Sequence, residues 1–178
     1  MSRPANLLSE RSRLWQQLSE FEITPPDQAW TFEARLAAEN GWGLDRGLAV
    51  TREYKKFLFL LLTVPHPVTP SEDVDSAWHL HLLYTRSYWD HLCAKIAERP
   101  IHHVPTCGGS REDQKYRQQY AQTLESYVAV FGVSPPPDIW PSVEKRFAAN
   151  QSRWVDTRLY YLVPRPWRWL KGCLDRVR

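Results

Sequence analysis

The sequence is poor in several features that define common protein classes, beginning with cysteine. Its three cysteines, Cys93, Cys107 and Cys173, include no CxxC pair, so neither a disulfide framework nor a structural zinc knuckle is indicated, and a reducing compartment is favoured. The longest apolar run, FLFLLLTV from Phe57 to Val64, is far shorter than the ~20 residues needed to cross a bilayer. The beginning, MSRPANLLSERSRLW, lacks the apolar core of a signal peptide, so we expect a cytoplasmic protein.

Glycine and an excess of charge of one sign are also missing. The net charge of +3 is too small to indicate nucleic-acid binding, and we do not expect a nucleic-acid partner. There are only 7 glycines against 14 prolines, which is typical of helices joined by proline-containing loops. What the chain does have is aromatic residues, 13% of the total with nine tryptophans, and these suit a small helical core or a ligand cleft.

Helical periodicity and local start and stop signals predict an all-α fold. We expect a single-domain helical bundle of about five to seven helices with Pro-rich connecting loops. Thr24 and Ser71 are the expected N-caps of the second and fourth helices, and Gly41 ends the second. The expected helices cover residues 6–21, 24–40, 49–62, 72–97 and 111–131, with a short one in SVEKRFAAN; only RLYYLV near the end resembles a strand.

The chain divides by composition into three parts within that single domain. The first, residues 1–48, holds N-terminal helices, and the second, residues 49–150, is the core that carries the histidine motifs. The third, residues 151–178, is a basic aromatic tail that we expect to pack on the same domain.

The stretch VDSAWHLHLLYTRSYWDHLC, within the expected helix 72–97, contains three of the six histidines. At about 100° per residue, His79 and His81 lie about 200° apart, so they do not easily hold the same ion. Asp75 and His79 are one turn apart and can chelate a metal together or form a carboxylate–imidazole hydrogen bond. The predicted core face consists of Val74, Trp78, Leu82, Thr85, Trp89, Leu92 and Ile96, and the polar strip at its edge of Asp75, His79, Arg86, Asp90 and Cys93.

A third ligand has to come from outside this helix, and PIHHVP supplies the candidates. The flanking prolines favour extended backbone, so the rings of His102 and His103 should point to opposite sides, and one of them can turn toward the helix. Asp75, His79 and either His102 or His103 would form a two-histidine, one-carboxylate set suited to a divalent metal, zinc or non-haem iron.

A purely structural interpretation has comparable weight. In that interpretation Asp75 is a helix N-terminal carboxylate, His79 is a core-edge histidine donating to a carbonyl, and His102 and His103 belong to a loop packed by prolines. His81 is a secondary candidate for the site. Arg86 is another, and it either supports the ligands or forms an i,i+4 surface pair with Asp90.

Four segments of the sequence resemble the glycine-rich domain-containing protein-like family. They are VDSAWHLHLLYTRSYWDHLC, IHHVPT, YAQTLESYVAVFG and PPPDIWP. The resemblance covers roughly residues 54–141 and implies no particular reaction, because the family has no settled biochemical activity. It does raise the weight of a site, since packing alone gives no reason for these polar residues to occur together. The residues that carry it are Val74, Asp75, Trp78, His79, His81, Leu82, Leu83, Thr85, Tyr88, Cys93, His102, His103, Pro105 and Thr106.

Two further features suggest other chemistry. Cys107 is a candidate nucleophile with His102 or His103 as its base, provided that a helix N-terminus lowers its pKa. The tail PRPWRWLKGCLDRVR, if helical, is amphipathic and could lie on an anionic membrane surface or on a partner, or dock on the core. Its candidate contact residues are Trp167, Arg168, Trp169 and Lys171.

Two functional hypotheses therefore follow from the sequence. The first is a metal or acid–base site built on Asp75, His79 and His102 or His103. The alternative is a non-catalytic module that binds a protein or peptide in an aromatic-rich groove, with a peripheral membrane contact through the tail.

Overall fold

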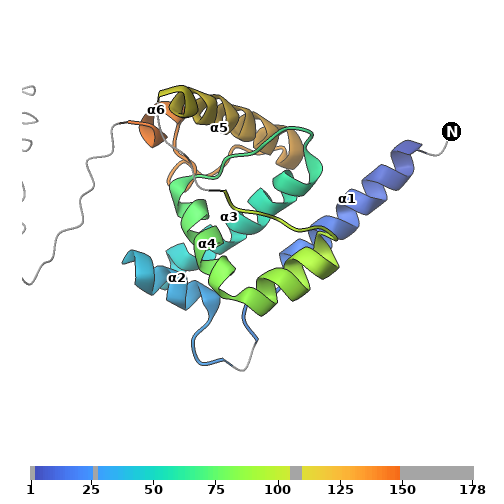
Figure 1. The fold of residues 1–178 in the computed structure, drawn as a ribbon, viewed down its shortest axis with the longest axis vertical. Helices are drawn as coiled ribbons and strands as arrows, with labels where there is room; N and C mark the ends of the chain where they lie inside the picture. The colour runs from blue at the N-terminus through green and yellow to red at the C-terminus, as the bar shows by residue number, and fades with distance from the viewer. Residues whose placement is uncertain (1–2, 26–27, 105–109, 149–178) are drawn as a thin grey trace, which may run out of the picture. The chain divides into compact units, whose positions relative to one another are not determined.

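The computed structural model describes residues 3–25, 28–104 and 110–148. The described part of the chain consists of helices joined by loops and contains no strand (Figure 1). The expectation of an all-α fold is therefore confirmed. Within Met1–Ala148 the chain forms one compact unit. The helices are α1 (Arg3–Glu20), α2 (Phe32–Asn40), α3 (Leu44–Thr63), α4 (Glu72–Leu83), the π-helix η1 (Arg86–Ile96), α5 (Ser110–Phe131) and α6 (Val143–Arg146).

The tail, residues 151–178, lies outside the described residues, and so do the expected strand RLYYLV and Cys107. The divisions at residues 48 and 150 stay predictions. Among the residues that are described, no helix is long and apolar enough to span a membrane.

Helix α3 is the centre of the unit and packs against α1, α2, α4 and α5 (Figure 1). It begins at Leu44, five residues before the predicted start at Ala49. The glycines in this segment are the reason, because they are poor helix formers by propensity. Gly43 is the extended N-cap, and Gly47 lies inside the first turns, where α2 approaches so closely that a Cβ would collide with the Glu33 carbonyl oxygen. Tertiary packing here outweighs helix propensity.

Helix α2 begins later than predicted. Its N-cap is Thr31, whose Oγ1 accepts a hydrogen bond from the Ala34 amide, and the expected cap Thr24 lies seven residues earlier. Thr24 Oγ1 nevertheless accepts a bond from the Phe32 amide, so it satisfies one N–H of the first turn from outside the helix. The predicted end is confirmed, since Gly41 has φ 67°, a left-handed conformation that glycine adopts easily.

The predicted helix 72–97 is two helices. Ser71 caps α4 as expected, with its Oγ accepting from the Val74 amide, but α4 ends at Leu83 and Tyr84 takes φ −84° and ψ 60°. The following η1 is a π-helix, in which hydrogen bonds run from i to i+5 and the 100° wheel no longer applies. The predicted faces are only partly right after Leu83. Leu92 is buried as expected, but Trp89, expected in the core, is 40% exposed, whereas Cys93, expected on the polar strip, is 4% exposed.

Helix α5 closes the core, and its Tyr120 and Tyr127 are completely buried. The buried carboxylate of Glu53 links this helix to α3 and to the loop after α5. Its Oε2 accepts hydrogen bonds from the Tyr127 hydroxyl and from the Trp140 indole, both at 2.9 Å, and its Oε1 accepts from Lys56 at 2.9 Å. Every polar atom of this carboxylate therefore has a partner, as a buried charge requires.

Candidate metal centre

Two of the candidate residues come from one face of α4. Asp75 lies in the first turn, with its amide donating to the Ser71 carbonyl oxygen at 2.8 Å, and His79 follows one turn later. The i,i+4 spacing places their side chains next to each other on the helix surface. The distance from Asp75 Oδ2 to His79 Nε2 is 3.6 Å.

The third residue, His103, comes from the extended segment after η1. A chain of hydrogen bonds ties that segment to α4: the Trp78 indole donates to the Tyr88 hydroxyl at 2.9 Å, and this hydroxyl donates to the Ile101 carbonyl oxygen at 2.8 Å. Burial raises the pKa of Tyr88 to about 12, so the hydroxyl keeps the proton that it donates. The His103 ring then packs edge-on against the Trp78 ring, with 4.6 Å between centroids.

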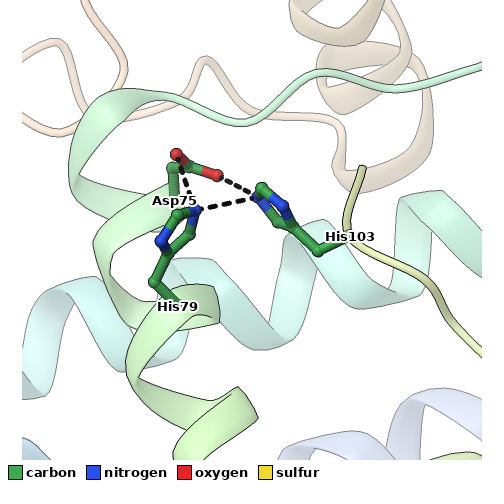
Figure 2. Close-up of side chains that lie close together, drawn as sticks. All are labelled: Asp75, His79 and His103. Carbon is green, nitrogen blue, oxygen red and sulfur yellow. Dashed lines mark hydrogen bonds and ion pairs between the residues drawn. The ribbon is translucent and has the colours of Figure 1, made fainter. Parts of the chain in front are cut away.

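In the resulting cluster the three side chains point toward one another (Figure 2). His103 Nε2 lies 2.9 Å from Asp75 Oδ1 and 3.1 Å from His79 Nε2. The two imidazole rings are nearly perpendicular, at 85°, with their Nε2 atoms facing each other. Among the described residues this is the group of histidine, cysteine and acidic side chains whose geometry could hold a metal ion.

The hydrogen bonds of the cluster depend on which ring nitrogens carry a hydrogen. If His103 Nε2 carries a hydrogen, that single N–H faces both the Asp75 carboxylate and the His79 nitrogen. If it carries none, its lone pair faces those same two groups. A cation at the centre would accept lone pairs from all three residues at once, which a single proton does not do.

The cluster is accessible from solvent. The exposed fractions of the side chains are 60% for His79, 35% for Asp75 and 16% for His103, so the ring from the loop is the most buried of the three. All three line a pocket of about 470 Å³. A small molecule can therefore reach the cluster without a change in the fold.

Of the two loop histidines, only His103 joins the cluster. His102 is exposed, and its ring is 6.0 Å from that of Trp89, although it lines the same pocket. The two neighbouring rings thus have different contacts, His103 with His79 and His102 with Trp89. Arg86 lies away from the cluster and lines a second pocket, and no ion pair joins it to Asp90 in the described part of the chain.

His81 is a core residue. Its Nδ1 is 2.9 Å from the Tyr54 hydroxyl and its Nε2 is 3.2 Å from Ser87 Oγ, which lines a pocket of about 630 Å³. The order serine, histidine, tyrosine resembles a nucleophile with its base and orienting group. However, burial lowers the pKa of His81 to about 3, far below the range in which a general base works. The neutral ring is therefore a structural connection between α3, α4 and η1.

The pocket beside the Asp75, His79 and His103 cluster is also lined by residues that were not predicted from the sequence. Arg146 and Phe147, at the end of the short helix α6, line the wall shared with the cluster, together with Tyr116 from α5. No sequence signal connected Arg146 and Phe147 with Asp75, because about seventy residues separate them from it and the contact depends on how the loop after α5 folds back.

Searches of protein-family models, curated proteins and solved structures found no match to this chain. Its functional interpretation therefore depends on the geometry described above. Cys107 and the tail residues Trp167, Arg168, Trp169 and Lys171 lie outside the described residues, so their expected roles stay predictions.

Proposed function

We propose that this helical protein binds one divalent transition-metal ion through Asp75, His79 and His103. The single observation that carries the proposal is the convergence of the Asp75 carboxylate and two imidazole Nε2 atoms at the wall of an open pocket. Asp75 Oδ1 lies 2.9 Å from His103 Nε2, Oδ2 lies 3.6 Å from His79 Nε2, and the two nitrogens are 3.1 Å apart.

These separations fit the spacing of ligands around one ion. With metal–nitrogen bonds of about 2.0–2.1 Å, two ligand atoms are about 3.3 Å apart in a tetrahedron and about 2.9 Å apart at a right angle. His103 Nε2 lies 2.9 Å from Asp75 Oδ1 and 3.1 Å from His79 Nε2, close to these values, and the other carboxylate oxygen, Oδ2, lies 3.6 Å from His79 Nε2. The cluster would thus accept an ion with only small side-chain rotations.

The donor types narrow the choice of metal. Two imidazoles and one carboxylate suit zinc or non-haem iron(II), whereas magnesium and calcium prefer oxygen ligands throughout. Three protein ligands also leave coordination positions open, as in catalytic rather than structural sites. An ion here would act as a Lewis acid or activate a bound water molecule, for a ligand that enters the pocket.

The acid–base alternative uses the same residues without a metal. There the Asp75 carboxylate orients the His103 ring, and His79 exchanges a proton with a ligand. The approach of the two Nε2 atoms to 3.1 Å favours the metal, because one ion would accept a lone pair from both nitrogens and from the carboxylate at once. The non-catalytic interaction module, with a protein or peptide partner, and the membrane contact of the tail remain alternatives to be tested separately.

We also propose that the chain is a relative of the glycine-rich domain-containing protein-like family. The support is that the segments VDSAWHLHLL and IHHVPT resemble motifs of this family. All three residues of the cluster come from these two motifs. The metal site would then be a common feature of proteins that carry both motifs.

Metal binding can be tested by dialysing the purified protein against zinc or iron(II), followed by elemental analysis and titration calorimetry. We expect one ion per chain. Asp75→Asn and His79→Ala should each weaken affinity by more than about 100-fold, because loss of a ligand costs more than loss of a group that merely supports one. His102→Ala is the matched control, since this neighbouring histidine lines the pocket outside the cluster.

Absence of stoichiometric metal from the wild-type protein would overturn the proposal. So would equal affinities for His102→Ala and His79→Ala, which would indicate adventitious surface binding by histidine. Circular dichroism of each variant distinguishes a lost ligand from a lost fold.

A further inference from the structure

The pocket beside the cluster has a mostly apolar wall. Its volume of about 470 Å³ lies in the range of sites for small organic molecules. The side chains that form this wall are Val68, Pro70, Trp78, Val104, Tyr116 and Phe147. Such a surface favours a ligand with an aromatic or branched apolar body over a strongly hydrated inorganic ion.

One cation, Arg146, lines the same pocket and is held in place by its neighbours. Its Nε donates to the Pro70 carbonyl oxygen at 3.0 Å. Its guanidinium carbon lies 5.1 Å from the centre of the Tyr120 ring and 4.9 Å from that of Phe147, so both rings stack on it. The side chain is only 15% exposed.

The guanidinium has donors to spare for a ligand. Its approach to an acidic partner is long, with 3.9 Å between Nη1 and Glu72 Oε1, and in the described part of the chain its hydrogen bond to protein is the one from Nε. A guanidinium carries five N–H donors in a planar fork that matches a carboxylate. An ordered arginine of this kind binds an anion at a lower entropic cost than a mobile one.

The formal charges in the pocket make anion binding depend on the metal. Asp75 and Asp113 contribute −2 and Arg146 contributes +1, so the lining carries −1 with neutral histidines. A divalent ion in the cluster would change this to +1. An anion is therefore repelled from the metal-free pocket and attracted to the loaded one.

We propose that the metal-loaded pocket binds a small organic monocarboxylate with an aromatic or branched apolar body. The carboxylate is held by the Arg146 guanidinium and the field of the metal ion, and the body packs against Trp78 and Phe147. This inference rests on the proposed metal site and adds the class of ligand that the site serves. A singly charged ligand is favoured over a dianion because Asp113 lies in the same lining.

The test uses the full chain loaded with zinc, after metal stoichiometry has been measured, and phenylacetate as the probe. Its neutral analogue phenylacetamide has nearly the same shape. By calorimetry or ligand-detected NMR we expect saturable binding of phenylacetate, binding at least about 10-fold weaker for phenylacetamide, and no measurable phenylacetate binding by the metal-free protein. Inorganic phosphate should bind more weakly than phenylacetate.

Substitutions assign the effect to one arginine. Arg146→Gln should weaken phenylacetate binding by at least about 10-fold and leave zinc stoichiometry at one. Arg117→Gln is the matched control, because Arg117 also stacks on the Phe147 ring, at 5.0 Å, and donates to the Phe147 carbonyl oxygen, but does not line the pocket.

Each outcome decides the question. Equal binding of the acid and the amide by the wild-type protein would overturn the inference, and this comparison holds even if Arg146→Gln fails to fold. Phenylacetate binding that Arg146→Gln and Arg117→Gln weaken equally would also overturn it. If zinc binds but phenylacetate does not, only the ligand class is wrong; if zinc does not bind, the proposed metal site fails as well.

Discussion

His103 Nε2 lies 2.9 Å from Asp75 Oδ1, although 28 residues separate the two in the chain. The contact joins the first turn of α4 to the extended segment after η1, and Trp78 supports the ring from behind. Because α4 holds Asp75 and His79 on one turn, the position of a single loop residue completes the cluster. The following experiments test that arrangement and the core on which it depends.

Metal binding should stabilise the fold measurably. A ligand that binds only the folded state, at a free concentration of about 100 times its Kd, adds about 2.7 kcal/mol to the free energy of unfolding. We expect zinc to raise the melting temperature of the wild-type protein and of His102→Ala, and to leave that of Asp75→Asn unchanged. Differential scanning fluorimetry with and without zinc measures the shift, and an equal shift in Asp75→Asn would contradict the assignment of this ligand.

The hydroxyl of Tyr88 should matter for both stability and metal affinity. Tyr88→Phe removes the group that joins the Trp78 indole to the Ile101 carbonyl and leaves both buried without that partner. We expect a loss of about 1–3 kcal/mol in the free energy of unfolding and weaker zinc binding, because the segment carrying His103 is held less firmly. Urea denaturation and calorimetry provide the two values.

The control for that change is Tyr116→Phe. The Tyr116 hydroxyl makes no hydrogen bond within the described residues, although its ring lines the pocket. Its removal should alter neither the stability nor the zinc affinity, and comparable losses in the two variants would argue against the hydrogen-bonded bridge.

Because of His81, the protein should be less stable at acidic than at neutral pH. Burial lowers the pKa of His81 to about 3 in the folded state, against an ordinary value of 6.5, so between these values the unfolded state binds the extra proton. The free energy of unfolding is therefore highest above about pH 6.5. It decreases as the pH falls below this value, by at most about 1.4 kcal/mol per pH unit. His81→Gln should reduce this dependence, whereas His91→Gln, at an exposed position, should not. Urea denaturation at pH 5 and pH 7 measures it.

The buried carboxylate of Glu53 should contribute far more to stability than a surface ion pair. Glu53→Ala leaves Lys56 without its carboxylate and the Tyr127 and Trp140 donors without their acceptor, and we expect a loss of about 3–5 kcal/mol. Glu39→Ala removes the partner of Arg35 in a pair whose side chains are both 47% exposed, and should cost less than about 0.5 kcal/mol. Similar losses in chemical denaturation would contradict this ranking.

Local signals in the sequence predicted much of the fold, because they act over three or four residues. Ser71 caps α4 through the Val74 amide, and Gly41 ends α2 through its own left-handed conformation. The π-helical geometry of η1 was not predictable from periodicity, since a change from i+4 to i+5 bonding alters which side chains share a face. Trp89 and Cys93 exchanged their expected surroundings for this reason.

The candidate site was predictable in part. The i,i+4 pair Asp75 and His79 followed from helical geometry, and the separation of His79 from His81 did too. The choice of His103 over His102 depends on tertiary contacts with Trp78 that no spacing rule contains. Arg146 was missed because its place in the pocket depends on a hydrogen bond to Pro70, 76 residues away.

The close approach of α2 and α3 determines which glycines of this sequence can be substituted during evolution. At Gly47 any side chain would collide with the backbone of Glu33, so descendants that keep this packing must keep the glycine. Gly43, four residues earlier, has open space where a Cβ would lie and is free to vary. The two glycines of GLDRG look alike in the sequence, but selection on the fold acts on Gly47, inside the helix, and leaves the N-cap Gly43 open to change.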